Sequence, residues 1–156
     1  MRVARSVFVQ RWLQAVEAGG SMTLGKTTPV LRIFDETKAT EFYVDFLGFR
    51  VGWRHRAAPD LPLYMEVVRD GCVLHLTEHH GDCTPGASVR VETSDVGALH
   101  AELLAKQYRY ARPNIESMPW GSREMSLADP FGNRLTFATT APSVASADFE
   151  IERPGD

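Results

Sequence analysis

The side chains best suited to metal binding lie near the middle of the chain. His75 stands in "VLHLTE", and a run rich in His, Asp and Cys follows at Glu78–Cys83. Imidazole, carboxylate and thiolate groups together can hold a divalent cation. However, adjacent residues at a strand end point to opposite sides, and the run lacks the regular spacing of a zinc site. We therefore expect a solvated loop after the strand.

No pattern typical of nucleophilic catalysis or phosphate binding occurs. The chain has neither a Gly-x-Ser-x-Gly motif nor a phosphate-cradling glycine loop. Cys72 is expected to be buried in a strand, and nothing near Cys83 suggests a lowered pKa. His100 fits a hydrogen-bonded structural role on a helix, and His55 stands among arginines. These residues predict no nucleophile–base pair.

Other residues suit a site for a flat, polar or cationic molecule. Trp53 and Trp120 offer aromatic faces. Arg32 and Arg134 lie on predicted strands near the two ends of the sequence repeat described below. The alternatives are that Trp53 belongs to the core and that Trp120 closes a turn.

The segment "SREMSLADPFGNRLTF" predicts a strand, a turn and a second strand. Met125 and Leu127 alternate with Glu124 and Ser126, so the two polar side chains should face away from the core. Glu124 could contact a ligand or form a salt bridge with Arg32 or Arg134.

Two similar sets of elements must position these residues. The first set is a strand at 28–34, a helix capped by Asp35 and ended by Gly48, and three strands, two of them joined by the turn pair Asp70-Gly71. The second set repeats it with Ser94 or Asp95 as the helix cap. The five-position helix pattern recurs 57 residues later. It is Ala39, Phe42, Tyr43, Phe46 and Leu47 in the first set, and Val96, Leu99, His100, Leu103 and Leu104 in the second.

The repeat predicts an α+β fold of two βαβββ modules, at about residues 26–80 and 86–140. Each helix would cover one face of its sheet, and the other faces would form a half-barrel cleft for a small ligand. Residues 1–25 would be an N-terminal extension, whose apolar spacing predicts a helix that packs on the domain or binds a membrane or a partner. Residues 141–156 would be a polar tail.

Composition excludes several classes of protein. The net charge of -3 argues against nucleic-acid binding, and no apolar run is long enough to span a membrane. Polar residues interrupt the apolar N-terminal residues, which argues against a secretory signal. Two cysteines are too few for a disulfide framework, so a cytoplasmic protein is expected.

Three segments resemble the vicinal oxygen chelate superfamily, which includes glyoxalase I, extradiol dioxygenases and bleomycin-resistance proteins. They are "PVLRIFDETKATEFYVDFLGFRV", the Asp-Gly hairpin, and "PWGSREMSLADPFGNRLTF". The third resembles bleomycin-resistance-like members in particular.

The resemblance implies four positions for metal ligands, usually His, Gln or Glu. In this sequence they fall on Thr28, on His75, near Gly86–Ser88 and on Thr136. Only His75 is a plausible ligand, so a metal cofactor is not expected. The resemblance therefore implies a non-catalytic protein that sequesters an antibiotic-like molecule, in a homodimer with the cleft between chains.

The expected ligand-binding residues are Arg32, Trp53, His75, Trp120, Glu124, Ser126 and Thr136. One alternative is a metal-dependent lyase, isomerase or dioxygenase that uses His75 with His79, His80 or Glu124. Another is a structural or regulatory protein that binds its partner through the N-terminal helix.

Overall fold

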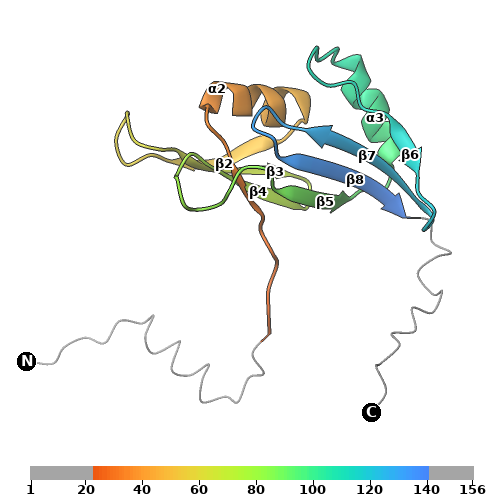
Figure 1. Ribbon diagram of the computed structural model, residues 1–156, viewed down its shortest axis with the longest axis horizontal. Coiled ribbons are helices and arrows are strands. Elements are labelled where there is room, and N and C mark those ends of the chain that lie inside the picture. The colour runs from red at the N-terminus through yellow and green to blue at the C-terminus, as the bar shows by residue number, and fades with distance from the viewer. Residues whose placement is uncertain (1–22, 141–156) are drawn as a thin grey trace, which may run out of the picture.

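The computed structural model describes residues 23–140, which form two βαβββ modules (Figure 1). The first module contains β1 (Val30–Arg32), α2 (Glu36–Ala39) continuing into the π-helix η1 (Thr40–Phe46), β2 (Arg50–His55), β3 (Tyr64–Arg69) and β4 (Cys72–Thr77). The second contains β5 (Ser88–Glu92), α3 (Val96–Ala105), β6 (Ile115–Ser117), β7 (Ser122–Ala128) and β8 (Arg134–Thr140). The predicted α+β fold is confirmed. The predicted N-terminal helix and the C-terminal tail lie outside the described residues.

Both sheets have the same mixed topology. Their strand orders are β1-β4-β3-β2 and β5-β8-β7-β6. The first strand of each module pairs in parallel with the last, and the other neighbours are antiparallel. The predicted Asp70-Gly71 turn is confirmed, since Arg69 pairs directly with Cys72.

The helices begin and end where the sequence predicts. Asp35 accepts a hydrogen bond from Lys38 N at 2.8 Å, Asp95 accepts one from Gly97 N at 2.8 Å, and Gly48 ends η1 with a φ of 74°. All five predicted apolar positions of the first helix are buried. In the second helix Leu104 is 45% exposed, so the prediction is wrong there. The first helix thus buries every position of the predicted i, i+3, i+4, i+7, i+8 spacing, whereas α3 buries only Val96 and Leu103.

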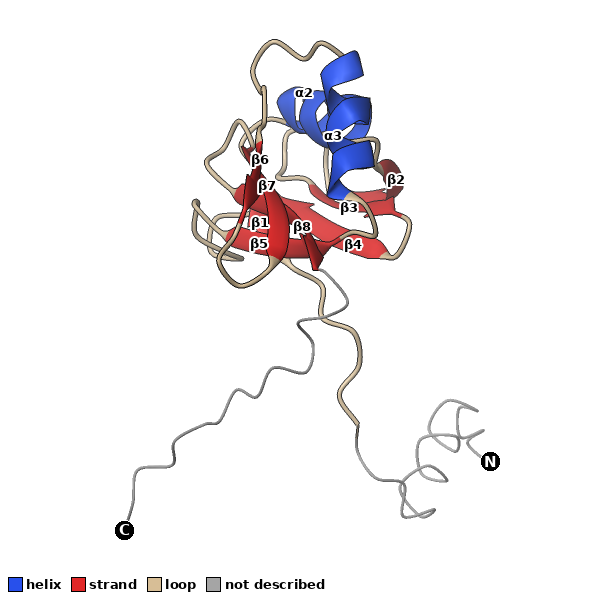
Figure 2. Cartoon of the chain, turned by 90° about the vertical axis from the view of Figure 1, so that its right-hand side faces the viewer, coloured by secondary structure: helices blue, strands red, loops and turns tan. Residues whose placement is uncertain are grey.

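One apolar core joins the two modules. Figure 1 places both helices on the same side of the sheets, and Figure 2 shows them packed above the strands. Side chains from the helix-facing side of both sheets belong to a single buried cluster, which includes Met65, Leu74, Met125 and Leu135. The opposite face of each sheet, which we call the open face, carries the polar residues discussed below.

A buried polar contact ties the β7–β8 turn to the first module. The Asp129 carboxylate accepts hydrogen bonds from the Tyr43 hydroxyl at 2.7 Å, from Asn133 Nδ2 at 2.7 Å, and from the backbone N–H groups of Phe131 at 2.9 Å and Asn133 at 2.8 Å. Asn133 Nδ2 also donates to the carbonyl of Arg32 at 2.8 Å. The Asp129 carboxylate therefore accepts four hydrogen bonds, and the contact spans both modules.

Tyr43 should make stability sensitive to alkaline pH. Burial first, and then the Asp129 carboxylate, raise the pKa of the Tyr43 phenol far above its ordinary value of 10.0. The stabilisation that corresponds to the raised pKa is fully present below pH 10 and is lost as the pH rises towards the folded-state pKa. We expect the unfolding free energy to fall by up to about 1.4 kcal/mol per pH unit above 10.

Urea unfolding of wild type and Tyr43→Phe at about pH 8 and about pH 11 measures this effect. The variant should lose about 1 kcal/mol at the lower pH, because one hydrogen bond is gone. It should then decline less steeply than wild type. Equal pH slopes for the two proteins would show that Tyr43 does not titrate with unfolding.

Candidate functional site

An aromatic cluster occupies the open face of the first module. Core residues Met65 and Val67 of β3 alternate with Tyr64 and Glu66, which therefore point to the open face. The pairing register places Glu66 opposite His75. It also places Trp53 of β2 opposite Glu66 on its other side. Four side chains that the sequence separates thus meet on adjacent strands.

The four side chains contact one another closely. Trp53 stacks on Tyr64 with ring centroids 5.7 Å apart and an interplanar angle of 4°. The His75 ring meets both edge-on, at 5.2 Å from Trp53 and 5.4 Å from Tyr64. Tyr64 Oη lies 3.0 Å from His75 Nδ1, and His75 Nε2 lies 3.4 Å from Glu66 Oε2. We call these four residues the aromatic platform.

The platform is exposed to solvent, and its packing depends on a glycine. Trp53 is 42% exposed, so the alternative that it belongs to the core is wrong. The register of β2 shifts between Val51 and Trp53, and a Cβ atom at the intervening Gly52 would overlap the Glu66 carboxylate. The glycine therefore leaves the space in which the Glu66 side chain lies.

Tyr64 and Glu66 were absent from the residues expected from the sequence, although the sequence holds the signal. A two-residue turn at Asp70-Gly71 pairs Arg69 with Cys72. Counting outward from that pair places Glu66 opposite His75. The carboxylate partner of His75 could therefore have been found by extending the hairpin register.

A second polar cluster lies on the open face of the other module, around Glu124. Its Oε1 atom accepts hydrogen bonds from Arg90 Nη1 at 2.6 Å, Ser122 Oγ at 2.6 Å and Trp120 Nε1 at 3.1 Å. Glu124 is 7% exposed, whereas Trp120 is 59% exposed and keeps its ring face open. Glu124 is therefore anchored by its neighbours and holds Trp120 in place.

The expected salt-bridge partners of Glu124 were wrong. Arg90 makes the contact, while Arg32 and Arg134 do not. Glu124 pairs with Ala138 of β8, and Arg90 pairs from the other side with Thr136, two residues earlier on the same strand. The small side chain at Ala138 allows the guanidinium to reach across β8.

The three hydrogen bonds, with that from Ser122 contributing most, lower the pKa of Glu124 below its ordinary value of 4.5. A lowered folded-state pKa contributes stability that is present above pH 4.5 and is lost as the pH falls through the folded-state pKa. We therefore expect wild type to lose stability in acid more steeply than Glu124→Gln. Urea midpoints at about pH 6 and about pH 3 measure this difference, and parallel losses in both proteins would contradict it.

The remaining expected residues are placed apart from these clusters. Ser126 and Thr136 lie side by side on the open face, with hydroxyl oxygens 2.9 Å apart. Arg32 is 9% exposed, and its guanidinium carbon lies 5.1 Å from the Phe34 ring centroid. Its Nη1 atom has no hydrogen-bond partner within the described stretch. The structure thus joins Trp53 with His75, Trp120 with Glu124, and Ser126 with Thr136. Within residues 23–140, no side-chain hydrogen bond or ring contact joins one of these pairs to another.

The four family ligand positions do not fit a divalent cation. Gly86 has no side chain, and Thr136 offers only a hydroxyl, which lies 2.9 Å from the hydroxyl of Ser126. Within residues 23–140, no group of three or more His, Cys, Asp and Glu side chains could hold a metal. In the Glu78–Cys83 loop, Asp82 instead accepts a hydrogen bond from the Thr77 hydroxyl at 2.7 Å. His75 and the neighbouring Glu66 carboxylate supply two ligands, fewer than such a site needs.

Other expectations for single residues also agree with the structure. His100 Nε2 lies 2.8 Å from the carbonyl oxygen of Pro113, as expected for a structural histidine. Burial raises the pKa of both the Cys72 and the Cys83 thiols, so neither is an activated nucleophile. No helix within the described part of the chain is long and apolar enough to cross a membrane.

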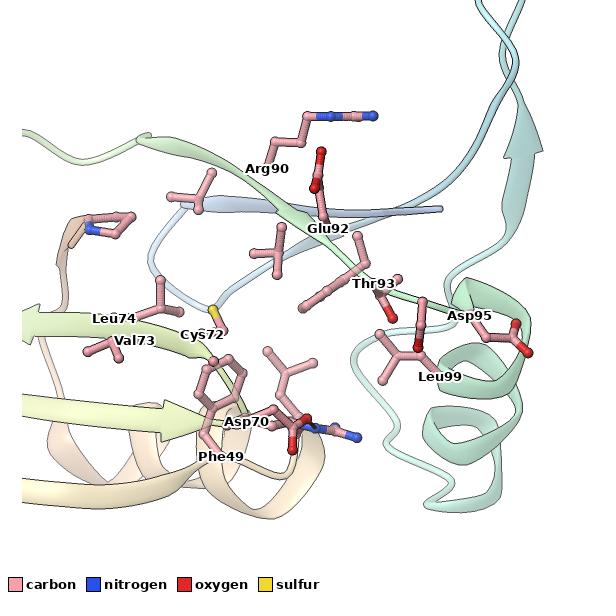
Figure 3. A pocket seen from close by; sticks show the side chains of 18 of the residues that line it. Phe49, Asp70, Cys72, Val73, Leu74, Arg90, Glu92, Thr93, Asp95 and Leu99 are labelled. Carbon is pink, nitrogen blue, oxygen red and sulfur yellow. Dashed lines mark hydrogen bonds and ion pairs between the residues drawn. The ribbon is translucent and has the colours of Figure 1, made fainter. Parts of the chain in front are cut away.

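A groove of about 730 Å³ lies at the junction of the two modules, apart from the residues expected to bind a ligand (Figure 3). Its module-one wall includes Phe49 and residues 69–74, and its module-two wall includes residues 89–95 and α3. We call it the junction groove. It has the volume of a small-molecule pocket, but it contains none of the aromatic platform.

The sequence and the fold are similar to those of known proteins. The model of a family described as "Glyoxalase superfamily protein" matches residues 14–143. The bleomycin-binding protein from bleomycin-producing Streptomyces verticillus, solved with copper(II)-bleomycin, is 28% identical and aligns with 78% of this chain and 99% of its own, with a TM-score of 0.57. TnmS3, an antibiotic binding protein from Streptomyces sp. CB03234, is 22% identical over 78% of this chain and 100% of its own, with a TM-score of 0.59.

A comparison with curated proteins gave no match. The family match covers most of the chain, and the solved structures align over nearly their whole length. The resemblance drawn from the three sequence segments is therefore confirmed. The chain belongs to the glyoxalase superfamily and shares its fold with antibiotic-binding members of the bleomycin-resistance type.

Proposed function

We propose that the protein binds a small, antibiotic-like molecule on the aromatic platform and sequesters it without chemical change. The observation that supports this most strongly is the partly exposed Trp53–Tyr64 stack beside the Glu66 carboxylate. A planar aromatic group can extend the stack, and a cationic group can pair with Glu66. A bleomycin-type glycopeptide, which combines such groups, is the first ligand to test.

Sequestration requires affinity and no reactive group. The donor set around His75 and Thr136 is unsuited to a metal ion, which argues against the metal-dependent lyase, isomerase or dioxygenase. We propose that no metal cofactor is needed. Metal analysis of the purified protein tests this. One divalent ion per chain in wild type that is lost in His75→Asn would contradict the proposal.

Titration with bleomycin, followed by tryptophan fluorescence, tests the proposed function. Trp53 and Trp120 are both exposed enough to report on a bound ligand. We expect saturable quenching with a midpoint in the micromolar range or below. Absence of any saturable change up to high micromolar bleomycin and copper(II)-bleomycin would reject these ligands.

We further propose a cytoplasmic homodimer in which the open face of one chain's first module lies against the second module of another. Such an arrangement would bring the aromatic platform of one chain near Trp120 of its neighbour. Sedimentation of the purified protein tests the dimer, and a single species of monomer mass at micromolar concentration would contradict it.

A further inference from the structure

We propose that the aromatic platform is a one-electron relay. A redox-active molecule in contact with Trp53 removes an electron, and the oxidation ends on Tyr64, whose phenolic proton moves to His75. This activity goes beyond the proposed function and does not rest on it, since any outer-sphere one-electron oxidant can serve. Three observations carry the inference: an exposed tryptophan stacked on a tyrosine, a base in hydrogen-bond contact with that tyrosine, and a carboxylate beside the base.

Trp53 is the platform residue that an oxidant in solution reaches. It is 42% exposed, and its ring lies parallel to that of Tyr64, with centroids 5.7 Å apart and an interplanar angle of 4°. This separation is in the range of stacked aromatic pairs, so the two π systems are in direct contact. Because the rate of electron transfer falls steeply with distance, Tyr64 is well placed to donate an electron to an oxidised Trp53 ring.

The Tyr64 hydroxyl is placed to lose its proton as its ring is oxidised. Burial first, and then Asp82 and Cys83, raise the pKa of the Tyr64 phenol above its ordinary value of 10.0, so the hydroxyl is protonated at neutral pH. Its oxygen lies 3.0 Å from His75 Nδ1, within the reach of a general base. A phenol that loses an electron becomes a strong acid, so a base in contact with it lets the proton leave in the same step.

Glu66 orients the His75 ring to accept this proton. Because the phenol donates to Nδ1, the neutral imidazole carries its hydrogen on Nε2, which lies 3.4 Å from Glu66 Oε2. Glu66 has no other ion pair among the described residues. When the proton arrives, the imidazolium lies beside this carboxylate, which stabilises the new positive charge.

The step is balanced in electrons and protons. The oxidant gains one electron from Trp53, and Trp53 recovers one from Tyr64, which also gives its proton to His75. The products are the reduced oxidant, a neutral phenoxyl radical at Tyr64 and an imidazolium at His75. A soluble one-electron reductant such as ascorbate then returns an electron to Tyr64, and the proton moves back from His75.

Other aromatic residues of the described chain lack one of these features. Tyr110 is 66% exposed, but its hydroxyl makes no hydrogen bond within residues 23–140. Trp120 is 59% exposed, but no ring contact joins it to a tyrosine in the same stretch. The Tyr43 hydroxyl donates to Asp129, yet its ring is fully buried. Exposure alone therefore predicts oxidation at Tyr110, whereas the relay predicts it at Tyr64.

The test oxidises the full chain with photogenerated tris(bipyridine)ruthenium(III). EPR spectroscopy identifies the kind of radical, and mass spectrometry of a spin-trap adduct locates it. We expect a tyrosyl radical on Tyr64 in wild type, and a tryptophanyl radical on Trp53 in Tyr64→Phe. His75→Gln should slow formation of the tyrosyl radical by at least about tenfold, because the general base is lost while a polar side chain remains.

Two further variants separate the relay from general oxidation of surface residues. Trp53→Phe should lower the yield of the Tyr64 radical several-fold, because the residue that the oxidant reaches is lost. Trp120→Phe is the matched control, since it removes a more exposed indole and should leave that yield unchanged. Titration with bleomycin measures affinity and not oxidation, so the proposed function and the relay can fail separately.

Three outcomes would overturn the proposal. One is the absence of any tyrosyl radical in wild type, and another is a radical that resides on Tyr110. The third is a Tyr64 radical that forms at the same rate in wild type and in His75→Gln.

Discussion

Replacing Asp129 with alanine should lower the free energy of unfolding by about 3–5 kcal/mol. This is the largest stability effect that we expect from the substitution of one buried polar residue. Asp129 is 5% exposed and accepts four hydrogen bonds, from Tyr43, Phe131 and two nitrogens of Asn133. Truncation would leave these donors buried and without an acceptor. Because the contact spans both modules, its loss should also weaken their association.

Urea unfolding at neutral pH measures the loss, and Glu116→Ala serves as the control. Glu116 is an exposed carboxylate on β6, so its removal should change stability by less than about 0.5 kcal/mol. Asp129→Asn should fall between the two, because the amide keeps the shape and one acceptor oxygen. A variant Asp129→Ala within about 1 kcal/mol of wild type would show that water replaces the carboxylate.

Removal of the Trp53 ring should weaken ligand binding by about 10- to 100-fold, the effect of losing one stacking surface in a small-molecule site. The effect rests on the proposed function. Stability should change little, because Trp53 is 42% exposed and lies on the open face. The loss of affinity should therefore appear without a matching loss of fold.

Isothermal titration calorimetry is the suitable measurement, since the variant lacks one of the fluorescent reporters. Trp53→Phe should recover part of the affinity, because a smaller ring still stacks on Tyr64. Tyr110→Ala is the matched control, as Tyr110 is an exposed aromatic residue outside both sheets. Equal affinities for wild type and Trp53→Ala would place the ligand elsewhere on the chain.

Much of the fold followed from local patterns in the sequence. The repeated apolar spacing identified both helices, and the Asp70-Gly71 pair identified the hairpin. The alternation at residues 124–127 placed Met125 and Leu127 in the core and Glu124 on the other face. Each of these features depends on residues that are close in the sequence.

The contacts of the site depend on residues far apart in the sequence, and these were harder to predict. Arg90 reaches Glu124 because β5 and β7 flank the same strand, a neighbourhood that strand order alone decides. Arg32 is buried with its guanidinium beside the Phe34 ring, a placement that no periodicity encodes. The arrangement of the two sheets therefore had to be known before the ion pairs could be assigned.

The tight turn at Asp70-Gly71 limits how this protein can change over evolutionary time. Since side chains alternate along β3 and β4, one inserted residue in the turn would change which residues face each other across the hairpin. Either the turn or the entire face of one strand would have to be rebuilt, so lengthening this turn is a poor source of new binding specificity. We expect descendants of this chain to diversify their ligands through substitutions at Trp53, Tyr64, Glu66 and His75, with the length of the turn unchanged.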